Sequence, residues 1–211
     1  MNNGIVKYVI FLSTVILGIT SFYSCGKKYT SEQQKYISEI ENERIEKNNW
    51  MKHNPESPFV NDSTVHFEPL KYYKVDPDFV FRSKLYYYKS RDTVKIFGTK
   101  GEERKIVRFG YVKINHKDHL YNLNVYKGTT QDSVDYYTIW FTDKTTGDET
   151  YGVGRYLDFD LNPDSNFVYT IDFNMAYNPY CAYSARYSCA IPTKEDHLDM
   201  AVTAGEKKFH K

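Results

Sequence analysis

The sequence predicts an all-β-dominated fold: an antiparallel sandwich or barrel of about eight strands, with an N-terminal amphipathic helix and a proline-rich wrap. Three observations lead to this prediction. Short runs rich in Val, Ile, Tyr and Phe recur from residue 79 onward, and clusters of turn-forming residues separate them. Before them, residues 29–53 carry charged side chains spaced three and four apart, which is typical of a helix.

Residues 29–53 are predicted to form the helix. Thr30 and Ser31 are suitable N-caps, and Ser31 with Gln34 fits a capping box. The apolar stripe is thin, so we expect the helix to pack on the domain by one narrow face. The stripe consists of Tyr36, Ile37, Ile40 and Trp50.

The wrap follows over residues 54–77, which hold four of the seven prolines of the chain. Proline disfavours both helix interiors and central strands. The aromatic residues of this stretch still need burial, so we expect ordered but irregular structure. A long ordered loop is uncommon unless it has a function.

The predicted strands occupy most of the remaining chain. Their residues are 79–89, 93–98, 105–114, 119–127, 135–142, 151–161, 167–173 and 200–204. The run 105–114 carries apolar residues on both of its alternating faces, so we expect that strand to be covered on both sides.

The first 25 residues have the pattern of an export signal. Lys7 precedes an uncharged apolar run over residues 8–20, which is shorter than the roughly 20 apolar residues of a spanning helix. Ser24 stands directly before Cys25, where such signals are cleaved, and this resembles the lipobox of bacterial lipoproteins. We therefore expect a lipoprotein signal over 1–25. The alternatives are an ordinary signal peptide and an uncleaved anchor.

Lipidation of Cys25 would add several acyl chains such as palmitate, enough to hold the protein stably on a bilayer. The residues that follow contain neither an Asp beside the cysteine nor an acidic run, which favours the periplasmic face of the outer membrane. Phe22 and Tyr23 depart from the usual lipobox, which prefers Leu and a small residue at these positions.

After the signal we expect a tether over 26–35, a single β-rich domain over 36–206 and a polar tail over 207–211. Lys7 is the only charged residue up to Cys25. The chain after Cys25 therefore has 27 basic and 27 acidic residues, and its formal net charge is zero. This balance argues against nucleic acid as a partner, because such proteins need a basic surface.

Cys181 and Cys189 lie close together in one segment. An oxidising envelope permits a disulfide, and a Cys181–Cys189 bridge would stabilise the fold by about 2–3 kcal/mol in the chain-entropy model. The alternative is a pair of buried free thiols.

Two segments are rich in residue types that commonly bind ligands or take part in catalysis. In the first, 143–158, Gly152 and Gly154 are predicted inside a strand, where glycine often marks the close approach of a ligand or another backbone. Arg155 follows, and its planar guanidinium suits a carboxylate or phosphate. The second segment, 172–183, places polar groups at a strand end before a long loop, as many binding sites do.

Both segments also have a structural explanation. Arg155 could pair with an internal acid, such as Glu43 or Asp172, where one strand crosses another element. The loop after Asp172 could be locked by asparagine hydrogen bonds, by Pro179 and by the disulfide. Separately, the tyrosines near residues 86–88 are expected to face the core and the rim of the domain, although tyrosine-rich surfaces also suit sugar or protein contacts.

Signatures of the commonest enzyme classes are absent from the sequence, including G-x-S-x-G, the P-loop, G-x-G-x-x-G and H-E-x-x-H. His116 and His119 supply only two ligands, whereas a closed zinc site needs four. We therefore expect no metal and no cofactor.

Five longer motifs stand out: E-N-E-R-x-E-K (41–47), H-N-P-E-S-P-F (53–59), F-E-P-L-K-Y-Y-x-V-D-P (67–77), G-D-E-T-Y-G-x-G-R-Y-L (147–157) and D-F-N-x-A-Y-N-P-Y-C-A-Y-S (172–184). Together they resemble an uncharacterised family known as domain of unknown function 1684. The resemblance runs from about residue 36 to Glu206. It departs at Tyr180, where members more often have a second proline.

The resemblance implies one domain in which the helix, the wrap and the segments 143–158 and 172–183 belong together. The family pattern lies largely in loops and polar positions, whereas a scaffold would hold its pattern in the core. This favours a ligand site between these two segments and the helix.

The sequence therefore predicts an exported lipoprotein whose β-domain binds a small, anionic ligand. The expected partners are the bilayer, through the acylated N-terminus, and that ligand. One alternative is an envelope hydrolase with Asp172 or Glu149 as general base, and another is a structural lipoprotein that binds a protein through the wrap. The ligand-binding residues are expected to be Tyr151, Gly152, Gly154, Arg155, Asp172, Asn174, Tyr177 and Asn178.

Overall fold

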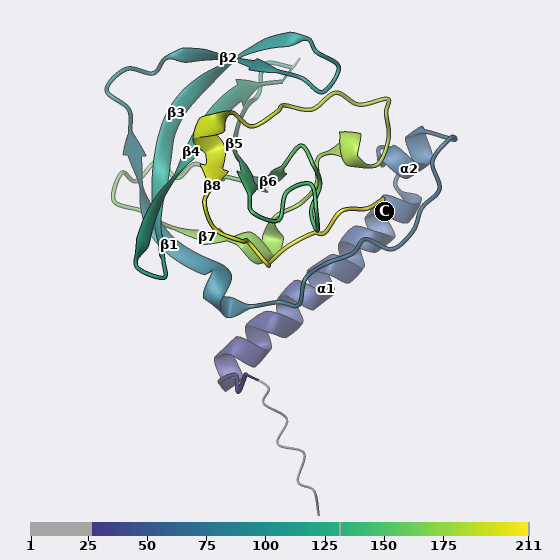
Figure 1. Ribbon diagram of the computed structural model, residues 1–211, viewed down its shortest axis with the longest axis horizontal. Coiled ribbons are helices and arrows are strands. Elements are labelled where there is room, and N and C mark those ends of the chain that lie inside the picture. The colour runs from purple at the N-terminus through teal and green to yellow at the C-terminus, as the bar shows by residue number, and fades with distance from the viewer. Residues whose placement is uncertain (1–26, 131, 211) are drawn as a thin grey trace, which may run out of the picture.

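A curled sheet of eight strands, mostly antiparallel, forms a half-barrel in the computed structural model, which describes residues 27–130 and 132–210 (Figure 1). The strand order is β6-β5-β4-β3-β1-β7, while β2 pairs with β3, and β8 pairs in parallel with β5. The predicted fold class is confirmed. The strands are β1 Val80–Tyr87, β2 Thr93–Phe97, β3 Glu103–His116, β4 His119–Thr129, β5 Asp135–Asp143, β6 Arg155–Asp158, β7 Val168–Asp172 and β8 His197–Leu198.

The predicted signal and Cys25 lie outside the described residues, so export and lipidation remain predictions. In the part of the chain that the structure describes, no helix is both long and apolar enough to cross a membrane.

Two of the predicted strands are wrong in extent. The strand expected over 151–161 is reduced to β6, because residues 151–154 form a turn in which Gly154 has a φ of 114°. The strand expected over 200–204 is absent, and the short β8 lies just before it.

A β-bulge in β3 explains why this strand is covered on both sides. The register against β4 shifts between Arg108 and Gly110, so Phe109 is an extra residue. The shift turns Ile106 toward a cluster on one face of the sheet, while Val112 joins the main core inside the half-barrel. The first cluster contains Ile96, Ile106, Tyr126, Trp140 and Ala190.

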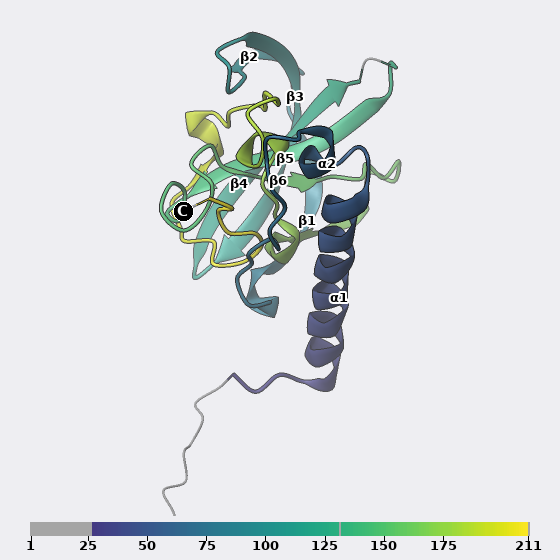
Figure 2. The same ribbon diagram turned by 90° about the vertical axis from the view of Figure 1, so that its right-hand side faces the viewer.

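The N-terminal helix α1 spans Ser31–His53 along one side of the half-barrel, and its N-terminal half extends beyond the sheet (Figure 2). Thr30 is extended and forms the capping box with Gln33, one residue earlier than the predicted Ser31–Gln34 pair. The side chains of Ile40 and Met51 are buried, so the helix packs by a narrow face as expected.

The proline-rich wrap is ordered, as predicted. After the short helix α2 (Pro58–Asn61) the chain turns back and runs along α1 to the 3-10 helix η1 (Pro77–Phe79). The Leu70 amide donates to Asn48 Oδ1 over 2.8 Å, and Arg44 donates to the Tyr73 carbonyl oxygen over 2.8 Å. The aromatic residues of the wrap therefore face the protein, in a cluster formed by Met51, Phe59, Leu70, Tyr183 and Phe209.

The chain is ordered closer to both ends than the predicted boundaries. Residues 31–35 of the expected tether belong to α1, and Lys27 Nζ lies 2.8 Å from Asp76 and 2.6 Å from Asp78. In the expected polar tail, Phe209 is only 6 % exposed. The three apolar clusters of the described residues lie between Trp50 and Phe209, so we expect residues 26–211 to fold without the predicted signal.

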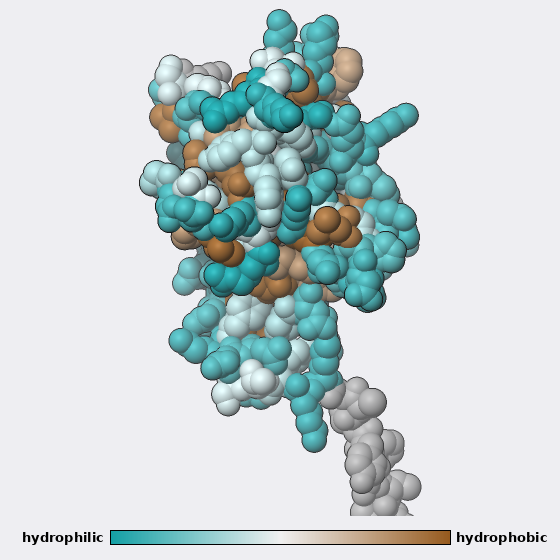
Figure 3. All heavy atoms as spheres, turned by 90° about the vertical axis from the view of Figure 1, so that its left-hand side faces the viewer, coloured by the Kyte–Doolittle hydropathy of each residue, from teal (hydrophilic) through white to brown (hydrophobic). Residues whose placement is uncertain are grey.

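The side of the half-barrel that faces left in Figure 1 is mainly hydrophilic. Hydrophobic residues appear there as separate spots among polar ones (Figure 3). Scattered apolar residues of this kind are normal on a monomer surface.

Replacing Phe209 by alanine tests the role of the C-terminal residues. Phe209 packs against the rings of Phe59 and Tyr183, so Phe209→Ala should lower the free energy of unfolding by roughly 3–5 kcal/mol. Urea denaturation of residues 26–211 measures this change. Phe97 is 54 % exposed, and Phe97→Ala should stay within about 0.5 kcal/mol of wild type. Equal effects of the two substitutions would contradict the packing described.

Candidate functional site

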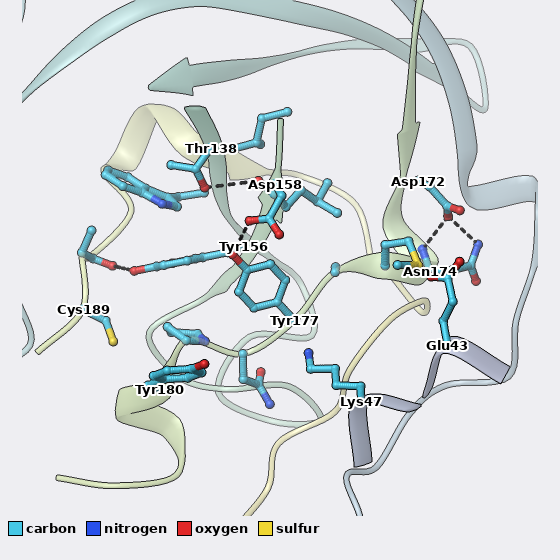
Figure 4. A pocket seen from close by; sticks show the side chains of 18 of the residues that line it. Glu43, Lys47, Thr138, Tyr156, Asp158, Asp172, Asn174, Tyr177, Tyr180 and Cys189 are labelled. Carbon is cyan, nitrogen blue, oxygen red and sulfur yellow. Dashed lines mark hydrogen bonds between the residues drawn. The ribbon is translucent and has the colours of Figure 1, made fainter. Parts of the chain in front are cut away.

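A large open cleft lies where the half-barrel fails to close. Its volume is about 1130 Å³, and it is lined by α1, β5, β6, β7 and the loop over 174–190 (Figure 4). Strands β6 and β7 are the two ends of the main strand order and do not pair with each other. Thr138 and Asp158 therefore lie on one side of the opening, and Thr170 and Asp172 on the other.

Tyrosine rings form much of the wall, and their hydroxyl groups hold them in place. Tyr177 donates to Asp158 Oδ1 over 2.6 Å, and Tyr156 donates to the carbonyl oxygen of Ala190. Burial raises the pKa of both tyrosines well above the ordinary value, so both hydroxyls remain donors at neutral pH. The rings are thus fixed before any ligand arrives.

Beneath this wall lies a buried carboxylate, Glu206, with no solvent exposure. Its Oε1 accepts from Asn178 Nδ2 over 2.9 Å and from the Tyr183 hydroxyl. Its Oε2 lies 3.2 Å from Lys47 Nζ, which also lies 4.9 Å from the centre of the Tyr177 ring. Lys47 therefore connects α1 to the cleft wall, and Figure 4 shows it extending toward Tyr177.

Asn178 lines the cleft and is only 1 % exposed. Its amide nitrogen donates to Glu206 and to the Lys207 carbonyl oxygen. Its Oδ1 has no hydrogen-bond partner among the residues that the structure describes. A buried acceptor without a donor carries a free-energy cost.

The three cations that line the cleft already have partners within the protein. Arg44 donates to the Tyr73 and Asn174 carbonyl oxygens, and Lys47 pairs with Glu206. Arg104 donates to the Ser188 carbonyl oxygen over 2.9 Å. Carboxylates also reach the cleft, from Glu43 and Glu46 on α1, from Asp158 and from Asp172.

At the rim, Asp172 and Asn174 tie β7 to α1 and η1. Asp172 Oδ1 accepts from the Asn174 amide over 2.8 Å, and Oδ2 accepts from the Tyr36 hydroxyl over 2.6 Å. Asn174 exchanges two hydrogen bonds with the backbone of Asp76. Both side chains thus have structural partners, and so does Glu149, which pairs with Lys207 over 3.0 Å.

Arg155 lies outside the cleft and has no solvent exposure. It donates to Asp143 Oδ2 over 2.9 Å and to the Val202 carbonyl oxygen over 2.8 Å, with further bonds to the carbonyl oxygens of Ala204 and Glu206. Its partner is an internal acid, although neither of the acids that the sequence suggested. The guanidinium therefore holds the C-terminal segment against β6.

The two glycines before Arg155 do not line the cleft either. A Cβ atom on Gly154 would lie 2.6 Å from the Phe141 carbonyl oxygen, in a backbone conformation with positive φ. Glycine is required there because the turn crosses β5 closely. A Cβ on Gly152 would lie 3.9 Å from Gly147 Cα, an ordinary contact distance, and nothing in the structure explains that glycine. Tyr151 donates to the Cys181 carbonyl oxygen, behind the wall.

The structure thus brings four of the eight predicted ligand-binding residues to the cleft: Asp172, Asn174, Tyr177 and Asn178. The prediction missed the residues that α1 and the paired strands β5 and β6 contribute. One signal was present, because Glu43, Arg44 and Lys47 belong to the motif at 41–47 and lie three or four apart on the helix. The missed residues include Glu43, Lys47, Trp140, Tyr156 and Asp158.

Cys181 and Cys189 are free thiols in the structure and lie side by side. Cys189 Sγ accepts a hydrogen bond from the Cys181 amide over 3.2 Å, and Cys189 lines the cleft. A hydrogen bond from the Cys189 thiol lowers the pKa of Cys181 to about 6. The disulfide remains a prediction that this proximity permits.

Within residues 27–130 and 132–210, no group of three or more His, Cys, Asp or Glu side chains is arranged to hold a metal ion. His116 instead stacks on Phe79 with ring centres 5.4 Å apart.

The chain is similar to a protein family and to a solved structure. A family model described as a protein of unknown function, DUF1684, matches residues 65–207. The fold is similar to a solution structure of an uncharacterised protein from gene locus rrnAC0354 of Haloarcula marismortui. That similarity has a TM-score of 0.60 and 26 % sequence identity, and covers 83 % of this chain and 96 % of the other. No curated protein matches the chain.

Removing the Arg155 side chain should destabilise the domain strongly. Arg155→Ala leaves the Asp143 carboxylate buried without its cation, which costs roughly 3–5 kcal/mol of unfolding free energy. Urea denaturation of residues 26–211 measures the loss. Arg82→Ala is the control, because Arg82 is exposed and its removal should cost less than about 0.5 kcal/mol. An Arg155→Ala protein as stable as wild type would show that this residue is not structural.

The two thiols should react unequally with an alkylating agent. Cys181 should be modified by iodoacetamide with a midpoint near pH 6, because only the thiolate reacts. Cys189→Ala removes the hydrogen bond that stabilises the thiolate and should move the midpoint up toward about pH 8.5. Mass spectrometry of the modified peptides across pH measures both midpoints. The same midpoint in both proteins would exclude this effect of Cys189.

Proposed function

We propose that this chain, which belongs to the DUF1684 family of proteins of unknown function, is an exported lipoprotein whose domain binds a small molecule in the cleft between α1 and the open side of the half-barrel. The observation that carries the proposal is a cleft walled by aromatic rings that the protein has already fixed in place. Sites for small molecules are usually preformed, mostly apolar concavities with a few placed polar groups.

The position of Lys27 indicates which part of the domain the proposed anchor would hold near the bilayer. Lys27 is paired with Asp76 and Asp78 only two positions after Cys25. An anchor at Cys25 would therefore hold the N-terminal end of α1 near the bilayer. Lys47 lies sixteen residues beyond Ser31 on α1, so the cleft lies roughly 24 Å along the helix from that end. We propose the periplasmic face of the outer membrane as the location.

The anionic ligand predicted from the sequence loses its main support. That prediction relied on Arg155, whose hydrogen bonds go to Asp143 and to backbone carbonyl oxygens. The wrap likewise turns its aromatic residues inward, so it offers no observation that favours a docking role. The preformed cleft is the observation that favours ligand binding over an anion site at Arg155 or protein docking through the wrap.

Blocking the cleft tests the proposed function. A library of neutral, cationic and anionic metabolites is screened by thermal unfolding of residues 26–211, where a ligand at about 100 times its Kd adds about 2.7 kcal/mol of stability. Thr170 is exposed and lines the cleft on β7, so Thr170→Phe should abolish the stabilisation.

Thr93→Phe provides the matched control, since Thr93 is also exposed on a strand but lies on β2, outside the cleft lining. This variant should respond to ligands as wild type does. Compounds that stabilise Thr170→Phe and wild type equally bind elsewhere, and a library without any stabilising compound would count against ligand binding.

A further inference from the structure

The chemistry of the cleft surface indicates which class of molecule it accepts. Rings line it on several sides: Tyr177 and Tyr180 on the 174–190 loop, Tyr156 on β6 and Trp50 on α1. Each of these four side chains is only partly buried, so part of each ring remains available for contact. Trp140 is nearly buried and stacks on Tyr126 with ring centres 4.7 Å apart. Aromatic faces contact flat apolar surfaces, such as the C–H face of a pyranose ring.

The polar groups of the cleft include both acceptors and donors. The cations Arg44, Lys47 and Arg104 already bind partners in the protein. Asp158 is exposed and accepts one hydrogen bond from Tyr177, while a carboxylate can accept about four. The exposed hydroxyl groups of Tyr136 and Thr170 also line the cleft and can donate or accept. A ligand with hydroxyl groups, which donate and accept, fits this lining.

A ligand donates hydrogen bonds from hydroxyl groups or from ammonium groups. The charges in the cleft favour hydroxyl groups. Lys47 Nζ already lies against the Tyr177 ring, where a cationic ligand would bind most favourably. A second cation there would be repelled. Four carboxylates and three cations line the cleft, so their formal charges nearly cancel. An uncharged, hydroxyl-rich ligand fits this balance better than an amine or an anion.

Size indicates how many rings the ligand has. The cleft volume of about 1130 Å³ lies slightly above the range of roughly 300–1000 Å³ that is typical for small-molecule sites. The cleft therefore has room for more than one sugar ring. It extends from the Asp172 rim to the wall formed by Tyr180 and Cys189, as Figure 4 shows.

From these observations we propose that the ligand is a neutral saccharide of two to four units, with a sugar ring packed on Tyr177 and Tyr156 and a hydroxyl group donating to Asp158. The proposal rests on the proposed function, because it assigns the ligand class of the same cleft. Tyr177 would act through its ring, since its hydroxyl is engaged with Asp158.

Intrinsic fluorescence gives a direct test, because the only two tryptophans of the chain, Trp50 and Trp140, both line the cleft. Residues 26–211 are titrated with three panels. The first contains oligomers of glucose and of N-acetylglucosamine with two to four units. The second contains spermidine and choline, and the third contains inorganic phosphate and citrate.

A saccharide ligand predicts a fluorescence change with the first panel that is independent of salt up to about 0.5 M. Tyr177→Ala should weaken the affinity roughly tenfold, while Tyr177→Phe should keep it within about threefold, because the ring remains. Asp158→Asn should have a modest effect, since the amide oxygen still accepts a hydrogen bond. Tyr86→Ala is the matched control on β1, outside the cleft lining, and should bind as wild type does.

The other outcomes separate the ligand class from the site itself. Binding of the second panel that is lost at high salt and in Asp158→Asn would overturn the saccharide proposal in favour of an amine, with the cleft still a ligand site. Binding of the third panel that strengthens in Asp158→Asn would overturn it in favour of an anion. No response to any panel would overturn the saccharide proposal, and the broader thermal screen would then decide whether ligand binding stands at all.

Discussion

The fold depends on a buried guanidinium. Arg155 has no contact with solvent, yet it carries a charge that must be compensated inside the protein. Asp143 compensates it, and the carbonyl oxygens of Val202, Ala204 and Glu206 accept its remaining hydrogen bonds. One side chain therefore holds the end of β5, the start of β6 and the C-terminal segment together. Because that segment lacks a strand ladder of its own beyond β8, these bonds replace the ladder.

The same C-terminal segment delivers Glu206 to the back of the cleft. Its carboxylate accepts from Asn178, Tyr183 and Lys47, which come from two different parts of the chain. Lys47 is in turn aligned against Tyr177, whose hydroxyl binds Asp158. Hydrogen bonds in a low-dielectric interior are strong and specify geometry. The aromatic wall is thus oriented by a polar network that begins at the hydrogen bonds of Arg155.

The cleft itself follows from incomplete closure of the sheet. A closed barrel would pair β6 with β7 and leave no edge. Here α1 and the 174–190 loop lie beside the opening, so the edge residues of both strands become the lining of a cavity. In a half-barrel the unpaired edge is therefore a place where polar side chains and backbone can meet a ligand. This geometry explains why the lining combines strand, helix and loop residues.

Much of the fold was determined by local sequence. Runs rich in Val, Ile, Tyr and Phe, separated by turn-forming residues, placed seven of the eight strands, and the capping residues near Thr30 placed the start of α1 within one residue. The motifs that resemble a known family include the helix and the loop after Asp172, and both line the same cleft. These features depend on short-range periodicity and turn chemistry, which a sequence displays directly.

The tertiary structure decided the roles of the individual side chains. The sequence shows that Arg155 suits an anion, but only the path of residues 202–206 shows that carbonyl oxygens and Asp143 take up its donors. Likewise, nothing local distinguishes Lys47 from the other charged residues of α1, or Asp158 from the other acids. Lys47 and Asp158 are more than a hundred residues apart in the sequence. They line the same cleft because the half-barrel stays open. Local pattern therefore determined the elements, while long-range packing determined which side chains line the cleft and which are buried behind it.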